Sequence, residues 1–164
     1  MVLEKVIVAE MTHLQNMTTM EAALIEPLAV GFHAANQGGA HAGQTAVVMG
    51  AGCIGLVSLL ALKAEGVTKV IVVDVFDSRL EKAMQLGASA VINGKQQNTE
   101  EEIMKLTDGK GADLFIDTAG SQFTVSQAIR TAKNGGTIVL VGYPASGEMT
   151  LPISVAINKE LTFK

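Results

Sequence analysis

Six short apolar runs, separated by stretches with helical periodicity, constrain the fold of this chain more than any other feature. Most of them lack polar alternation, which is typical of strands buried on both faces of a parallel sheet that helices cover. Strand–helix–strand alternation predicts an α/β fold: a doubly wound parallel sheet in three layers with the strand order 3-2-1-4-5-6. The predicted strands are Thr45–Met49, Lys69–Asp74, Ala90–Ile92, Ala112–Asp117, Thr137–Val141 and Glu160–Phe163.

Start and stop signals delimit the helices between these strands. A crossover helix over Ile54–Glu65 would follow the first strand and end at Gly66. Before that strand, Thr19–Ala35 has helical character, and Pro27 inside it predicts a kink or a break because proline removes an internal hydrogen bond. Two residue pairs have the spacing of capping boxes at the starts of later helices: Ser78 with Glu81, and Thr99 with Glu102.

Length and composition favour one compact domain. The chain has 164 residues, of which 48% are hydrophobic and 17% charged, and this balance argues against disorder. The net charge of −4 and the lack of a basic run argue against a nucleic-acid partner.

Ala42–Leu62 is uncharged and long enough to cross a bilayer, but glycines interrupt it and the sheet needs it, so no membrane partner is expected. The single cysteine, Cys53, cannot form an internal disulfide, and we expect a cytoplasmic location.

A glycine-rich turn, GAGCIG at residues 50–55, joins the first strand to its helix. The pattern G-x-G-x-x-G is weak alone, but between a strand and a helix it predicts the dinucleotide-binding turn of a Rossmann fold. Gly50 would permit the tight turn, Gly52 would let a pyrophosphate approach the backbone, and Gly55 would let the helix pack closely. The free N–H groups of the helix N-terminus would bind the phosphates.

Asp74 ends the second strand nineteen residues after Gly55, where such folds bind the adenosine ribose. Its carboxylate would accept hydrogen bonds from both ribose hydroxyls and repel a 2′-phosphate, so the predicted cofactor is NAD rather than NADP. The alternatives are that Asp74 only caps the next helix and that the glycines only make a tight turn. Cys53 and Ile54 would lie beneath the cofactor, with Cys53 as a small loop residue rather than a reactive thiol.

Further candidates lie beyond the carboxyl ends of the strands, where open parallel sheets bind their ligands. Arg79 follows Asp74 by five residues and would lie over the adenine or reach the ribose; alternatively, it belongs to a solvated helix face. Small residues after the fourth and fifth strands would keep the cleft open for the nicotinamide, although ordinary turn chemistry would also explain them. They are Thr118, Gly120, Val141 and Gly142.

The stretch EAALIEPLAVGFHA at residues 21–34, followed by GAGCIG and VVDVFDSRL, closely resembles the medium-chain zinc-dependent dehydrogenases, and within them the sorbitol (L-iditol) and related polyol dehydrogenases. The resemblance runs from about Asn16 to Lys164. It implies hydride transfer between NAD and a secondary alcohol, with a catalytic zinc as Lewis acid on the substrate oxygen. By position it places Glu26 beside that zinc; without the resemblance, Glu26 would be a helix-face carboxylate at a helix break.

Other family features have no counterpart in these residues. The family binds its zinc with a cysteine and a His-Glu pair from an N-terminal domain, whereas this sequence has no His-Glu dipeptide and one cysteine, Cys53. The resemblance therefore implies that residues 1–18 connect to a missing catalytic domain. Residues 19–164 would form the NAD-binding domain, which binds the cofactor but does not catalyse alone, and zinc would be bound only in the parent enzyme.

Two other functions remain open, a non-enzymatic NAD-sensing domain and an S-adenosylmethionine-dependent methyltransferase. The small residues after the fourth and fifth strands favour nicotinamide over the second of these. Thr150–Phe163 is predicted to lie at the edge of the sheet, and an uncovered edge invites pairing with another chain. The family also pairs its subunits near this region, so a homo-oligomer, specifically a dimer, is expected.

Overall fold

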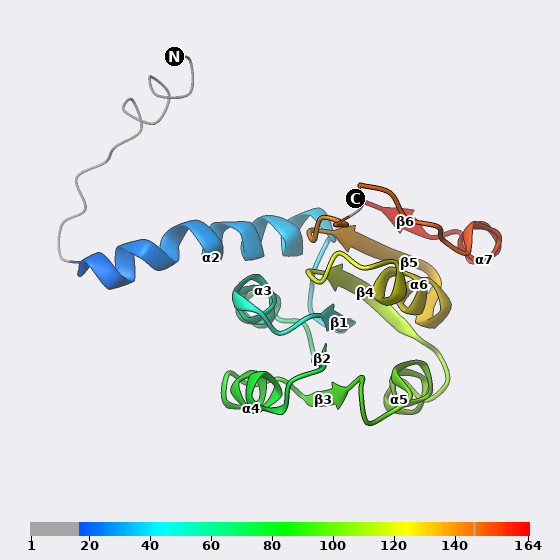
Figure 1. The fold of residues 1–164 in the computed structure, drawn as a ribbon, viewed down its shortest axis with the longest axis horizontal. Coiled ribbons are helices and arrows are strands. Elements are labelled where there is room, and N and C mark those ends of the chain that lie inside the picture. Colours follow the sequence, from blue (N-terminus) through cyan, green and yellow to red (C-terminus); the bar gives the residue numbers. More distant parts are fainter. Residues whose placement is uncertain (1–16, 146) are drawn as a thin grey trace, which may run out of the picture.

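The computed structural model describes residues 17–145 and 147–164 (Figure 1). Six parallel strands form one sheet in the predicted order, β3-β2-β1-β4-β5-β6. The strands are β1 (Thr45–Met49), β2 (Lys69–Asp74), β3 (Ala90–Asn93), β4 (Ala112–Asp117), β5 (Ala132–Leu140) and β6 (Thr162–Phe163). The helices are α2 (Thr19–Gln37), α3 (Cys53–Ala64), α4 (Asp77–Gln85), α5 (Thr99–Leu106), α6 (Gln122–Thr131) and α7 (Ile153–Asn158).

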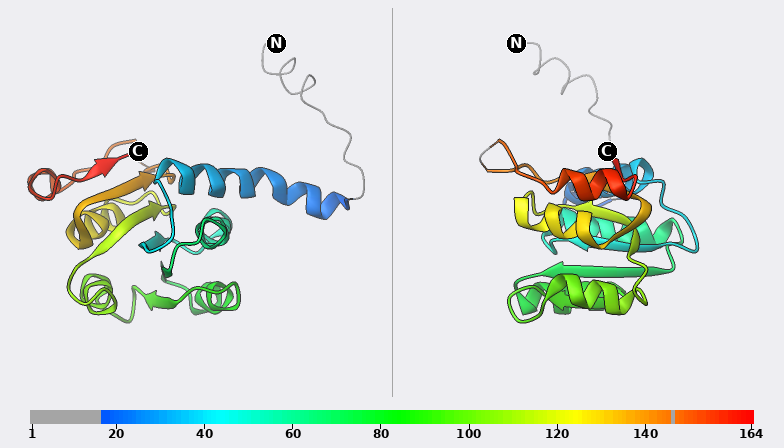
Figure 2. Two further views of the ribbon diagram at one scale, coloured as in Figure 1. Left: turned by 180° about the vertical axis from the view of Figure 1, so that it is seen from behind. Right: turned by 90° about the vertical axis from the view of Figure 1, so that its right-hand side faces the viewer.

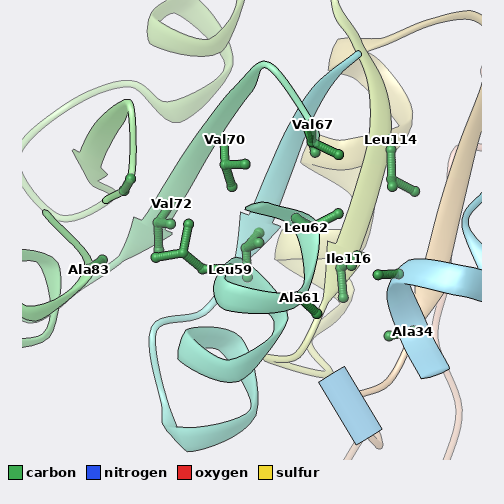
Figure 3. Packing of buried hydrophobic residues seen from close by; sticks show 14 of the residues in the cluster. Ala34, Leu59, Ala61, Leu62, Val67, Val70, Val72, Ala83, Leu114 and Ile116 are labelled. Carbon is green, nitrogen blue, oxygen red and sulfur yellow. The ribbon is translucent and has the colours of Figure 1, made fainter. Parts of the chain in front are cut away.

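Helices cover both faces of the sheet, so the fold has the three predicted layers (Figures 1 and 2). Helices α2, α3 and α4 lie on one face, and α5, α6 and α7 lie on the other. The first face contains a core cluster that includes Leu59 and Leu62 of α3 with Val72 of β2 (Figure 3). The second face contains a cluster that includes Phe115 of β4 and Ile129 of α6. Side chains from single strands therefore enter both cores, which explains their continuous apolar runs.

Helix α2 is one continuous helix of 19 residues, so of the kink or break predicted at Pro27 the break does not occur. Pro27 removes the hydrogen bond to the carbonyl of Ala23, but Ala23 is exposed and water can replace the missing donor. The helix starts with a capping box that the sequence analysis missed. The Glu21 N–H donates to Thr18 Oγ1 at 3.2 Å, and the Thr18 N–H donates to Glu21 Oε2 at 2.8 Å.

The two predicted capping boxes are wrong because the helices begin earlier than expected, α4 by two residues and α5 by one. Helix α4 has Phe76 as its N-cap, so Ser78 lies inside the first turn. The Asp74 carboxylate accepts a hydrogen bond from the Phe76 N–H at 3.0 Å and thereby fixes this earlier turn. Helix α5 is capped by Asn98, whose side-chain oxygen accepts the first free N–H groups, and Thr99 is buried inside the helix.

The carboxyl-terminal part of the sheet differs from the prediction in its boundaries. Strand β5 starts five residues earlier than expected, and its pairing with β4 contains an irregularity. The edge strand β6 is limited to Thr162–Phe163. Thr150–Ser154 adds no strand to this edge, because Pro152 has no N–H for a ladder and the chain continues into α7.

Residues 1–16, which make up most of the predicted connection to another domain, lie outside the described residues. Ala42–Leu62 forms β1, the glycine turn and most of α3. Within the two described ranges, no helix is both long and apolar enough to span a bilayer.

Gly31 provides a test of how α2 packs on α3. A Cβ added at Gly31 would lie 2.8 Å from the carbonyl carbon and oxygen of Val57. Replacing glycine by alanine ordinarily stabilises a helix interior by about 0.5–1 kcal/mol, but here the two helices would have to move apart. We expect Gly31→Ala to lower the free energy of unfolding, measured with urea, by about 1–3 kcal/mol. A variant as stable as the wild-type protein would contradict the close packing.

Candidate functional site

A cleft of about 390 Å³ opens at the carboxyl ends of β1, β2 and β4. Its volume lies within the range of about 300–1,000 Å³ that is usual for small-molecule sites, and its place follows the rule for open α/β sheets. The cleft brings together five predicted site residues: Gly50, Gly52, Asp74, Arg79 and Thr118. It is also lined by Ala119, within the predicted segment 118–120, and by residues that were not predicted: Val73, Val75, Gly94, Thr99, Phe123, Thr124 and Gln127.

The glycine turn at the floor of the cleft leaves room for a ligand. Gly50 has a φ of +102°, which side chains strongly disfavour. A Cβ added at Gly55 would collide with the carbonyl oxygen of Gly50, because α3 packs directly on the turn. A Cβ added at Gly52, by contrast, would meet no atom within 4 Å. The space in front of Gly52 is therefore open to the cleft.

The N-terminus of α3 points its free backbone donors toward the same end of the sheet. The helix begins at Cys53 with Gly52 as its N-cap, and no side chain caps its N–H groups. Uncapped N–H groups and the helix dipole favour an anion at this position. Cys53 is exposed and Ile54 is half-buried, and the residues that line the cleft do not include either of them.

Asp74 joins the glycine turn to the end of β2. Its Oδ2 accepts a hydrogen bond from the Ala51 N–H at 2.7 Å, and its Oδ1 accepts from Val75 at 2.7 Å and Phe76 at 3.0 Å. The residue is only 8% exposed, yet it lines the cleft. A carboxylate has about four acceptor positions and the three backbone N–H groups occupy three of them, so Asp74 can hold both turns and still accept a ligand hydroxyl.

Arg79 lies at the rim of the cleft beside this carboxylate. Its Nη1 is 3.7 Å from Asp74 Oδ2, and its guanidinium lies over the Phe76 ring at 4.8 Å from the centroid. The ring contact limits the directions in which the guanidinium can point. Arg79 is thus more than part of a solvated helix face, although half of its side chain is exposed.

Thr118 connects the end of β4 to the glycine turn. Its hydroxyl donates to the carbonyl oxygen of Met49 at 3.0 Å and lies 3.3 Å from that of Gly50, while its N–H donates to Met49 at 2.9 Å. The sequence predicts only a small residue at this position. The hydroxyl in addition fixes the turn whose open face forms the cleft.

The remaining predicted residues do not line this cleft. Val141 and Gly142 line a separate hollow together with Tyr143, at the carboxyl end of β5. Gly120 is buried and lies against Gly142, so closely that a Cβ on Gly142 would collide with the Gly120 nitrogen. The structure therefore places Gly120 against the turn after β5 rather than around Asp74.

Asp117, the last residue of β4, is a buried acid that the sequence analysis missed. Its exposed fraction is zero, and its Oδ2 accepts a hydrogen bond from the Gly120 N–H at 2.9 Å. Its Oδ1 has no hydrogen-bond partner in the part of the chain that the structure describes. Burial raises the pKa of Asp117, and hydrogen bonding opposes this shift only in part. The available signal was a charged residue at the end of an apolar strand, as at Asp74.

The described residues do not offer a zinc site. Across residues 17–145 and 147–164, no three His, Cys, Asp or Glu side chains come together in a way that could hold a metal ion. Glu26, the predicted neighbour of a zinc, lies exposed on α2.

Comparison with known proteins relates this geometry to dehydrogenases. A family model described as zinc-binding dehydrogenase matches residues 53–164. The uncharacterized zinc-type alcohol dehydrogenase-like protein YdjJ of Escherichia coli is 44% identical over 149 residues, which are 91% of this chain and 42% of that protein. Sorbitol dehydrogenase of Bacillus subtilis is 38% identical over 86% of this chain and 40% of that protein.

A solved structure agrees with these sequence matches. The crystal structure of an Escherichia coli oxidoreductase/dehydrogenase of unknown specificity matches with a TM-score of 0.86 at 43% identity, over 92% of this chain and 43% of that one. The chain thus spans about two fifths of the length of the relatives that it matches.

The burial of Asp117 predicts how stability depends on pH. Because the pKa is raised from 3.8 in the folded state, the folded protein keeps this proton where the unfolded chain has lost it. The contribution of Asp117 to stability therefore falls as pH rises from 3.8 to the folded-state pKa. Asp117→Asn keeps an acceptor for Gly120 but does not titrate, so its stability relative to wild type should rise across this window in urea unfolding. A difference that is constant with pH would contradict the raised pKa.

Proposed function

Because this chain belongs to the zinc-binding dehydrogenase family and is similar to sorbitol dehydrogenases, we propose that it is the NAD-binding domain of a polyol dehydrogenase. The observation that carries the proposal is the open space at Gly52, between the uncapped N-terminus of α3 and the Asp74 carboxylate. The whole protein would oxidise a secondary alcohol to a ketone. Family membership favours this function over the methyltransferase alternative.

The described residues fit a dinucleotide in an extended pose. The diphosphate would lie at Gly52 against the first N–H groups of α3, and Asp74 would accept a hydroxyl of the adenosine ribose. Arg79 would lie beside the adenosine, and Val141 and Gly142 would contact the nicotinamide beyond β5. When bound, the nicotinamide ring would supply the redox chemistry by accepting a hydride from the alcohol.

The charges at the ribose end of the cleft support NAD over NADP. The Asp74 carboxylate is buried and held by three backbone N–H groups, so it cannot turn away from a 2′-phosphate. Arg79 could attract such a phosphate, but its guanidinium already lies 3.7 Å from Asp74 and is half exposed, which reduces its effect.

Zinc belongs to the proposal for the whole protein and not to the described part of this chain. There it would act as a Lewis acid on the substrate oxygen, and Glu26 would lie near it. We propose that residues 1–164 bind the cofactor without turnover. A cytoplasmic location stays a prediction that rests on the single cysteine.

The cofactor proposal predicts that the chain binds NADH in calorimetric titration. Gly52→Ala should weaken this binding by about tenfold or more, because the methyl group would occupy the space of the diphosphate at a cost of about 1–3 kcal/mol. The same methyl group meets no protein atom, so the midpoint of thermal unfolding should not change. Lack of NADH binding by the wild-type chain at millimolar cofactor would contradict the proposal, as would unchanged affinity in a folded Gly52→Ala variant.

We also propose a dimer across the β6 edge of the sheet. Phe163 of β6 and Ile157 of α7 are 36% and 69% exposed, so apolar side chains lie beside unpaired strand groups. Sedimentation equilibrium should give twice the mass of the chain, and Phe163→Pro, which removes the N–H that faces away from β5, should shift the mass toward the monomer. A wild-type monomer at high concentration would refute this assembly.

A further inference from the structure

Two turns meet at the carboxyl end of the sheet, beside the cleft that Asp74 lines. The turn after β4 contains Gly120, which has a φ of +63°. A Cβ there would lie 2.5 Å from the carbonyl oxygen of Tyr143 and 2.7 Å from the carbonyl carbon of Gly142, both in the turn after β5. The two backbones therefore touch without an intervening side chain. A displacement of one turn must displace the other.

Asp117 is hydrogen-bonded to both turns. Its carbonyl oxygen accepts from the Val141 N–H at 2.8 Å and from the Gly142 N–H at 2.9 Å. Its side-chain Oδ2 accepts from the Gly120 N–H at 2.9 Å. The backbone of Asp117 thus holds the turn after β5, while its carboxyl group holds the turn after β4.

The carboxyl group is in an unfavourable environment for a purely structural acid. It is fully buried, and no donor among the described residues reaches its Oδ1. Its strand neighbours are Met49 of β1 and Leu140 of β5, and the uncharged Thr124 side chain of α6 interacts with the carboxyl group and offsets only part of the rise in its pKa. None of these residues carries a charge that could compensate the carboxylate. A buried polar atom without a partner costs about 1–3 kcal/mol, and such costs concentrate at functional sites.

We propose that Asp117 is a positioning residue for the nicotinamide half of the cofactor. Its carboxyl group sets the Gly120 turn, and through the contact of Gly120 with Gly142 it sets the backbone against which the nicotinamide would lie. Asp74 sets the adenosine half independently. This inference rests on the proposed function, because it assumes that the nicotinamide lies beyond β5.

Titration with NADH and with ADP-ribose, which lacks the nicotinamide, separates the two halves. Asp117→Ala removes the acceptor for the Gly120 N–H, so NADH affinity should fall about tenfold, the equivalent of one lost hydrogen bond. ADP-ribose affinity should stay within about twofold. Asp117→Asn keeps the acceptor and should restore NADH binding, whereas Asp74→Ala should weaken both ligands.

Asp113→Asn is the matched control. Asp113 lies at the opposite end of β4, and its carboxylate is 2.8 Å from the Lys133 ammonium group. Loss of the Asp113 charge should therefore leave the affinities for NADH and ADP-ribose unchanged. Equal losses of NADH and ADP-ribose affinity in Asp117→Ala would overturn the proposal, because a general loss of stability weakens the binding of both ligands alike. Unchanged NADH affinity in this variant would also overturn it.

A second measurement needs neither cofactor nor the alanine variant. The amide proton shifts of Gly120, Val141 and Gly142 are followed against pH by NMR in wild type and in Asp117→Asn. All three should move together over one pH range in wild type and stay constant in the variant. If the amide proton shift of Gly120 alone changes with pH, or if none of the three shifts changes, the carboxyl group does not set the turn after β5. A wild-type chain that binds neither ligand would instead overturn the proposed function, so the two failures are distinct.

Discussion

The hydrogen bond from the Ala51 N–H to the Asp74 carboxylate, at 2.7 Å, is the interaction on which the proposed site depends. It joins the glycine turn after β1 to the end of β2, and the same carboxylate fixes the start of α4. Hydrogen bonds to a charged group contribute about 1.5–3 kcal/mol each. The carboxylate that would recognise the ribose is therefore also the group that shapes the turn for the diphosphate.

The end of β4 completes this arrangement from the other side of β1. Thr118 fixes the glycine turn by its hydroxyl, and Asp117 holds the turns after β4 and β5. The two strands beside β1, β2 and β4, thus each end in a buried aspartate, Asp74 or Asp117, that accepts hydrogen bonds from backbone N–H groups. Parallel strands place these ends at one edge, so three short sequence segments that are far apart in the chain form one cleft.

Much of this could be predicted from the sequence because the signals are local. Continuous apolar runs indicated the strands, and the spacing of Gly50, Gly52 and Gly55 indicated the turn, whose backbone geometry permits few other residues. The lining residues of α6, such as Phe123 and Gln127, could not be predicted, because their place in the site depends on how α6 packs on the sheet. The separation of Val141 and Gly142 from the cleft likewise depends on the contact between two turns.

The most direct test of the central claim is a crystal structure of this chain with NADH. The diphosphate should lie against the N-terminus of α3 in front of Gly52, with a hydroxyl of the adenosine ribose bonded to the Asp74 carboxylate. Bound NADH with its diphosphate elsewhere, or with Asp74 bonded only to the backbone groups that it binds now, would contradict it.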